Sequence, residues 1–129
     1  PERSLTPVLG DERLIVQNIV FLAMGILEKV ITANHERYRR PDGYREVAWI
    51  KRCEMQVVGG LSMLERFIKP HPWLAGEKFT QADIMTGILC DHIGLTCPQL
   101  LEKLECPKLD TVLRACREHP AFINTVPEF

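Results

Sequence analysis

Asp83 stands at the front of an apolar run, "DIMTGILC", and a carboxylate in such a place needs a chemical or a structural role. Thr80 lies three residues before it, which is the T-x-x-D spacing of a helix capping box. In that motif the threonine oxygen accepts from the backbone N–H of residue 83, while the carboxylate accepts from the backbone N–H of residue 80. Phe79 and Ile84 flank the box at the spacing of a hydrophobic staple. The pattern predicts a helix that starts at Thr80 and a structural role for Asp83.

The alternative for Asp83 is a catalytic acid. General acid–base chemistry would require a second titratable group within reach. No second carboxylate or histidine stands at helical spacing on the same face of this run. His71, His92 and His119 are not grouped as metal ligands, and the sequence predicts no metal site.

The chain has five cysteines: Cys53, Cys90, Cys97, Cys106 and Cys116. The number is odd and no C-x-x-C pair occurs, which argues against a disulfide framework or a zinc site. Free thiols that serve as small core residues fit the pattern and a reducing, cytoplasmic setting. If one thiol is reactive, Cys106 has the best position, since it precedes Pro107 at a helix start.

Composition limits the class of protein. At 129 residues, 46% hydrophobic and 26% charged, the chain fits one globular domain with a sizeable core. The net charge of −1 gives no argument for nucleic acid or anionic lipid as a partner. The longest apolar run, Ile19 to Leu27, has nine residues and is too short to span a membrane. The chain begins at Pro1 without a secretory signal, and we expect it to be a piece of a longer protein.

Hydrophobic periodicity predicts two long helices at the start. The first runs from Asp11, as N-cap, to about Arg37, and its apolar middle predicts contact with neighbours on nearly every side. After "RRPDG" the second helix runs from about Tyr44 to Ile68, with Gly59-Gly60 inside it as a point of close helix approach or a kink. Its predicted buried stripe consists of Val47, Ile50, Val57, Leu61, Leu64 and Ile68.

Shorter helices follow. The third is expected from Thr80 to about His92, and Cys97-Pro98 begins a short fourth. "CPKLDTVLRACREH" predicts a fifth with Pro107 in its first turn, and "HPAFINTVPEF" a helical turn and a tail. Because no segment alternates with period two, we expect an all-α domain of five to six helices over residues 11–129, with residues 1–10 as a linker.

Three stretches together resemble the C-terminal domain of glutathione transferases. "WLAGEKFTQADIMTGILC" has the family's leucine-x-glycine turn, an aromatic residue and S/T-x-A-D at the head of a buried helix. The matching residues are Leu74, Gly76, Phe79, Thr80, Ala82 and Asp83. "CPKLDTVLRACREHPAF" is similar to the family's later helix with its Arg/His-Pro-x-Phe close, and "AMGILEKVITANHERYRRP" resembles the first helix of bacterial members.

The resemblance implies a division of labour between two domains. In full-length members a thioredoxin-like domain precedes the helical one, binds glutathione as cosubstrate and supplies the Ser, Cys or Tyr that stabilises its thiolate. Nothing in this chain has the pattern of a β-α-β unit, so we expect no catalytic residue and no bound cofactor within it. The implied partners are the thioredoxin-like domain, a small hydrophobic electrophile and a second copy of the protein in a homodimer.

The resemblance also places the electrophile-binding wall on the first helix, at Phe21, Met24, Gly25 and Glu28. Met24 stands where many bacterial relatives have the Asp of A-D-G, which makes the wall less polar. Core packing is the alternative for each position. Two functions remain open: a transferase that conjugates glutathione to small electrophiles or reduces peroxides, and a non-catalytic interaction module of the same fold.

Overall fold

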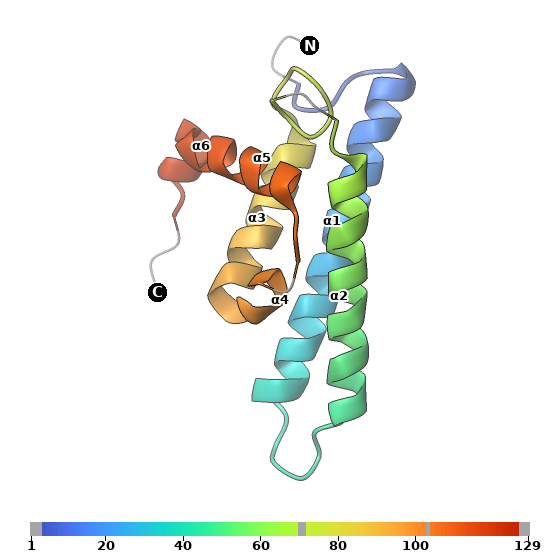
Figure 1. Cartoon of the computed structure of the whole chain (residues 1–129), viewed down its shortest axis with the longest axis vertical. Helices are drawn as coiled ribbons and strands as arrows, with labels where there is room; N and C mark the ends of the chain where they lie inside the picture. Colours follow the sequence, from blue (N-terminus) through green and yellow to red (C-terminus); the bar gives the residue numbers. More distant parts are fainter. Residues whose placement is uncertain (1–3, 70–71, 103, 127–129) are drawn as a thin grey trace.

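The computed structural model describes residues 4–69, 72–102 and 104–126. Within these residues the regular structure consists of six helices: α1 (Gly10–Tyr38), α2 (Val47–Phe67), α3 (Gln81–Thr96), α4 (Gln99–Glu102), α5 (Pro107–Glu118) and α6 (Pro120–Ile123). The long helices α1 and α2 form an antiparallel hairpin, α3 packs along α1, and α5 crosses α3 and reaches α2 (Figure 1). The predicted all-α fold is confirmed.

Helix α1 is the central element of the bundle, but it is buried on one face only. Its inward side chains pack against α2 and α3, and the buried stripe is Val16, Ile19, Ala23, Ile26, Val30 and Ala33. On the outer face Phe21 is 66% exposed and Met24 48% exposed. The prediction that neighbours surround this helix is therefore wrong for the described chain, because the apolar residues cover two faces and only one is packed.

The apolar character of α1 extends further than the run from Ile19 to Leu27. The helix has 29 residues, and its most apolar 18-residue window has a mean hydropathy of 1.9, so by length and composition it could cross a membrane. It is the single such helix in the part of the chain that the structure describes. In the fold its inner face packs along α2 and α3, and 28% of that window is buried.

The N-cap of helix α1 lies two residues before the predicted Asp11. It is Leu9, which makes no side-chain hydrogen bond, and Asp11 lies inside the first turn. The prediction of Asp11 as N-cap is therefore wrong, although its charge still lies near the positive end of the helix dipole. Gly10 takes a positive φ of 79°, a conformation that favours glycine, and this sharp entry displaces the cap from the aspartate.

Helix α2 starts three residues later than the predicted Tyr44. Glu46 is its N-cap, and the Glu46 carboxylate accepts from the Ala48 backbone N–H at 3.1 Å. Val47, at the first helical position, is 57% exposed and does not belong to the buried stripe. The other predicted members are buried: Ile50, Val57, Leu61, Leu64 and Ile68.

The glycine pair in α2 marks a close approach between helices. A Cβ atom built on Gly60 would collide with the side chain of Ile26 on α1. The absence of a side chain at Gly60 therefore allows α1 and α2 to pack closely here. The same atom on Gly59 would meet nothing within 4 Å. The predicted close approach is confirmed at Gly60, whereas Gly59 is an exposed position without such a constraint.

Two carboxylates from distant parts of the chain hold helix ends. Glu65 on α2 accepts from the backbone N–H groups of Lys108 and Leu109 at 3.0 and 2.9 Å, and so caps the N-terminus of α5. Glu36 at the end of α1 is 7% exposed and accepts from the Glu46 backbone N–H at 2.8 Å. These contacts fix α5 on α2 and the α1–α2 turn on α1.

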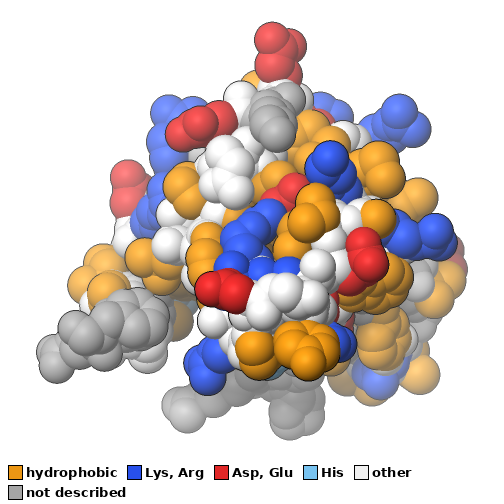
Figure 2. All heavy atoms as spheres, turned by 90° about the horizontal axis from the view of Figure 1, so that it is seen from below, with side chains coloured by type: hydrophobic (Ala, Val, Ile, Leu, Met, Phe, Trp, Pro, Cys, Tyr) orange, Lys and Arg blue, Asp and Glu red, His pale blue; other side chains and the backbone are white. Residues whose placement is uncertain are grey.

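The end of the molecule around the α1–α2 loop carries charges of both signs. Figure 2 shows basic and acidic side chains interspersed with exposed hydrophobic ones on this face. Glu36 pairs with Arg40 at 3.0 Å, and Asp42 pairs with Arg45 at 2.9 Å. This face is therefore mixed in sign, in keeping with the net charge of −1.

The predicted capping box opens helix α3, which runs one turn beyond the predicted end to Thr96. Asp83 is fully buried, and its Oδ2 accepts from the Thr80 backbone N–H at 2.8 Å and from the Thr80 hydroxyl at 3.0 Å. The Thr80 hydroxyl oxygen also accepts from the Ala82 backbone N–H at 3.3 Å. Asp83 Oδ1 accepts from the Leu74 backbone N–H at 2.8 Å, a bond that the motif does not predict. The carboxylate thus joins the helix start to the loop before it.

We predict that Asp83→Ala lowers the free energy of unfolding by roughly 2 to 4 kcal/mol, because it removes a cap and leaves buried donors unpaired. The matched control is Asp91→Ala on the same helix, which removes an exposed pair with Arg117 and should cost less than about 1 kcal/mol. Urea denaturation of the three proteins measures both changes. Equal midpoints for Asp83→Ala and Asp91→Ala would contradict the capping role.

Candidate functional site

The predicted wall residues lie together on the outer face of α1. Phe21, Met24, Gly25 and Glu28 occupy positions i, i+3, i+4 and i+7, which share one side of a helix. All four are exposed in the described chain. A Cβ on Gly25 would meet nothing within 4 Å, so the backbone there is open to a ligand between two apolar side chains and a carboxylate. The structure therefore brings these residues together on a surface and rules out core packing within this chain.

The charge on this face comes from Glu28. Its carboxylate forms no ion pair within the described residues. The neighbouring Lys29 ammonium lies instead over the ring of Trp49, 5.8 Å from the ring centroid. Phe21 and Met24 can bury a carbon skeleton, and Glu28 can face a polar or cationic group at its edge. The arrangement suits binding and orientation of a small molecule rather than proton transfer.

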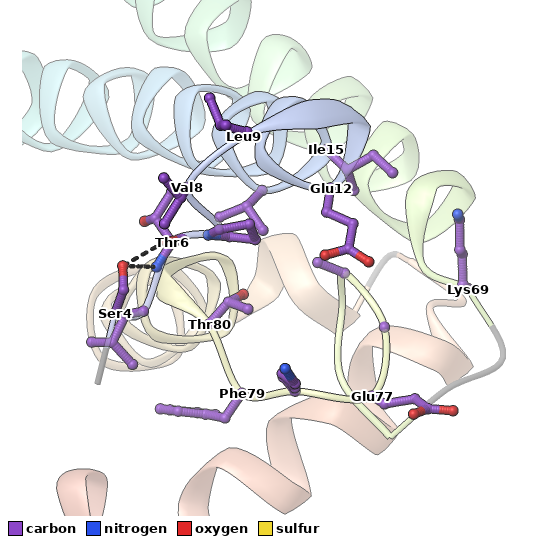
Figure 3. Close-up of a pocket in the computed structure, with 16 residues that line it drawn as sticks. Ser4, Thr6, Val8, Leu9, Glu12, Ile15, Lys69, Glu77, Phe79 and Thr80 are labelled. Atoms are coloured by element: carbon purple, nitrogen blue, oxygen red, sulfur yellow. Dashed lines mark hydrogen bonds between the residues drawn. The ribbon is translucent and has the colours of Figure 1, made fainter. Parts of the chain in front are cut away.

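A cleft of about 840 Å³ lies elsewhere, between residues 4–9, the start of α1 and the loop that precedes α3. Figure 3 shows Glu12, Glu77 and Lys69 toward one end and Ser4 and Thr6 toward the other. The N-terminal segment is fixed here because the Leu5 carbonyl accepts from the Gln81 backbone N–H at 2.9 Å. The cleft contains none of the α1 wall residues. The sequence does not predict this cleft, because residues from three separate segments form it.

Phe79 of the predicted staple belongs to an aromatic cluster. Its ring stacks on His119 with a centroid distance of 4.1 Å and an interplanar angle of 10°, and it meets the edge of Trp73 at 4.9 Å. His119 Nδ1 accepts from the Ala121 backbone N–H at 3.2 Å and caps α6. The cluster joins the loop before α3 to the end of α5. The staple contact between Phe79 and Ile84 stays a prediction.

All five cysteines are buried free thiols, as the sequence predicts. Burial raises the pKa of Cys90 to about 12 and that of Cys116 to about 12. The pKa of Cys106 is raised as well, by burial first and then by the charges of Glu65 and Asp110. The helix start at Cys106 therefore does not produce a reactive thiolate. Within residues 4–69, 72–102 and 104–126 there is also no group of three His, Cys, Asp or Glu side chains that could hold a metal ion.

Comparison with known proteins gives the family. Residues 48–123 match the glutathione S-transferase C-terminal domain, and the chain belongs to this family. A glutathione S-transferase from Methylobacterium radiotolerans, in complex with glutathione sulfonate, is 26% identical with a TM-score of 0.89 over 100% of this chain and 60% of that chain. The enzyme from Methylobacillus flagellatus with glutathione bound is 27% identical with a TM-score of 0.89, over 96% of this chain and 61% of that one.

A family member from Pseudomonas fluorescens with bound S-(propanoic acid)-glutathione shares the fold at 19% identity and a TM-score of 0.85, over 97% of this chain and 63% of that chain. No curated protein sequence matches the chain. The chain thus spans about 60% of the length of the solved transferases that it resembles.

We predict that the free energy of unfolding falls as the pH rises from about 9 toward 12. The pKa of a thiol is 9.0 when unfolded, and those of Cys90 and Cys116 are raised to about 12 in the fold, so the unfolded chain loses its protons first. Their stabilisation is complete below pH 9 and decreases by up to about 1.4 kcal/mol per pH unit for each thiol above it.

Urea denaturation at several pH values tests this. The control is a double variant, Cys90→Ala with Cys116→Ala, which retains every other titrating group and should show a shallower decline above pH 9. The same slope in both proteins would mean that these thiols do not control the alkaline loss of stability.

Proposed function

We propose that this chain is the electrophile-binding and dimer-supporting half of a glutathione transferase that conjugates glutathione to small hydrophobic electrophiles. The observation that carries the proposal is the exposed face of α1, where Phe21 and Met24 are left uncovered in a chain that belongs to the transferase family. Large apolar side chains on a surface mark a binding region when they are contiguous. Bacterial relatives of the same fold have been solved with glutathione bound, which supports glutathione as the cosubstrate.

Each wall residue has a distinct part in this proposal. Phe21 and Met24 cover the carbon skeleton of the electrophile, and the flexible methionine adapts to varied shapes. Gly25 lets a planar group approach the helix backbone, because no side chain stands there. Glu28 lies at the water-exposed edge. The wall accelerates the reaction by holding the electrophile near the glutathione sulfur, since orientation converts a bimolecular encounter into an effectively intramolecular step.

The proposal includes two protein partners. A thioredoxin-like domain of the same protein supplies the glutathione site and the thiol-activating residue. A second copy packs against α2, whose exposed apolar side chains Met55, Met63 and Phe67 recur at spacings of four and eight residues along one face. The buried, free thiols suit a cytoplasmic protein.

The alternative is a non-catalytic interaction module in which the α1 face contacts another protein. The amino-acid sequence that precedes Pro1 in the whole protein distinguishes the transferase from the interaction module. A thioredoxin-like stretch with a cis-proline motif and an activating Ser, Cys or Tyr supports the enzyme. A different domain in that place supports the module.

We predict that the isolated 129-residue chain, once circular dichroism shows it to be helical, does not bind glutathione. The reason is that the proposal assigns the glutathione site to the thioredoxin-like domain. Calorimetric titration with glutathione, with the full-length protein as positive control, measures this. Micromolar binding by the isolated chain would place the site in these helices and overturn the assignment.

We predict that Met24→Asp in the full-length protein lowers the kcat/KM for apolar electrophiles by about tenfold, while the KM for glutathione stays nearly constant. A buried methionine-to-substrate contact contributes 1 to 2 kcal/mol, or roughly tenfold in rate, and an aspartate removes it. Steady-state kinetics with each substrate varied in turn separates the two parameters.

The matched control is Leu95→Asp, which places the same charge at another exposed apolar position, 62% exposed on α3. This variant should leave the electrophile preference unchanged. If Met24→Asp folds normally and every electrophile reacts as before, the pocket does not include the outer face of α1.

A further inference from the structure

Glu28 lacks the structural role that the other acidic residues of α1 have. Asp11 and Glu12 lie in the first turn, near the positive end of the helix dipole, and the buried Glu36 belongs to an ion pair at the far end. Glu28 stands in the middle of the helix. Its carboxylate forms no ion pair with the described residues, and the Thr32 hydroxyl donates only to its backbone carbonyl, at 2.7 Å. The carboxylate is therefore available to a ligand.

No positive charge lies within one helical turn of Glu28 on its side of α1. The four positions one turn away are uncharged: Met24, Gly25, Ile31 and Thr32. Lys29 is adjacent in sequence, but consecutive residues do not face each other on a helix, and the Lys29 ammonium lies over the Trp49 ring of α2. The next titratable side chain on this side is His35, two turns further along. The negative charge of Glu28 is thus not neutralised by its neighbours on α1.

The apolar part of the wall and this charge are separated by the length of a small molecule. Phe21 and Glu28 are two helical turns apart, which is about 10 Å along the axis. Gly25 lies one turn from each of them, and a Cβ there would meet nothing within 4 Å. A ligand that rests on Phe21 and Met24 and crosses Gly25 therefore reaches the Glu28 carboxylate with its far end.

We propose that the electrophile conjugated on this wall carries an ammonium group and that Glu28 selects it, an inference that rests on the proposed function. The carbon skeleton packs on Phe21 and Met24, and the ammonium lies against the Glu28 carboxylate. Because Glu28 is exposed, the ammonium keeps most of its hydration, and no large desolvation cost opposes the contact. A neutral electrophile gains the apolar contact alone, and an anionic one is repelled.

Three para-substituted benzyl chlorides that differ in charge at the far end test this selectivity. The substituents are trimethylammoniomethyl, its neutral isostere neopentyl, and carboxymethyl. In each reaction the glutathione sulfur forms a bond to the benzylic carbon, the C–Cl bond breaks, chloride leaves with the bonding electrons, and the thiol proton passes to the buffer. Steady-state kinetics of the full-length protein gives the kcat/KM for each compound. Division by the uncatalysed rate constant with glutathione removes differences in intrinsic reactivity.

Variants at Glu28 assign the selectivity to its carboxylate. Glu28→Gln should lower the ratio of the cationic to the neutral kcat/KM by about two- to fivefold, the effect of one exposed charge pair. Glu28→Lys should invert the preference, so that the carboxymethyl compound reacts faster than the trimethylammoniomethyl one. The matched control, Glu118→Gln, removes the same charge from an exposed position on α5 and should leave the ratio unchanged.

Two results would contradict the selectivity while leaving the proposed function intact. If the neutral compound is conjugated but the ratio is the same in the unmodified protein and in Glu28→Gln, the carboxylate does not contact the substrate. If Glu118→Gln lowers the ratio as much as Glu28→Gln does, the net charge of the protein sets the preference. A third result is distinct from these: if none of the three compounds reacts faster than in buffer, the proposed function fails and the selectivity fails with it.

Discussion

The buried carboxylate of Asp83 is the contact on which the arrangement of the helices depends. It accepts from the backbone N–H groups of Leu74 and Thr80 and from the Thr80 hydroxyl, so it satisfies donors of the loop and of the helix start together. Burial raises its pKa, and these three hydrogen bonds offset part of that effect. Helix α3 begins here, packs along α1 and supports α5, whose Cys116 thiol lies 3.8 Å from the Asp83 carbonyl. A residue that could be read as a catalytic acid thus serves the scaffold.

With α3 in place, α1 has two separate functions. Its inner stripe binds the bundle together, and Gly60 on α2 lets the hairpin close against Ile26. Its outer face is apolar but unpacked, with Phe21 and Met24 exposed around an open Gly25. The inner contacts hold the helix backbone in place, so the outer residues keep fixed positions along one face while their exposed side chains can adapt.

Local patterns in the sequence predict the features that depend on neighbouring residues, and miss those that depend on distant ones. The all-α class, the order of the helices and the T-x-x-D box all follow from short-range spacing. The caps by Glu65 on α5 and by Glu36 at the α1–α2 turn do not, because each joins residues that only the fold brings together. Periodicity also overestimates the burial of α1: with apolar residues on two faces, the pattern does not show which face is packed. The same limit applies to the candidate site. The resemblance proposes Phe21, Met24, Gly25 and Glu28 but gives no information on their exposure, and the cleft at the N-terminal segment is built from three separate segments.

The central claim is that the outer face of α1 forms the electrophile wall of a two-domain transferase. A crystal structure of the full-length protein with S-hexylglutathione tests it most directly, because the hexyl group occupies the place of a conjugated electrophile. The account predicts that the hexyl chain lies in van der Waals contact with Phe21 and Met24, with Glu28 at the edge facing water. A structure in which the hexyl chain lies elsewhere, and the outer face of α1 is covered by another protein surface, would contradict the account.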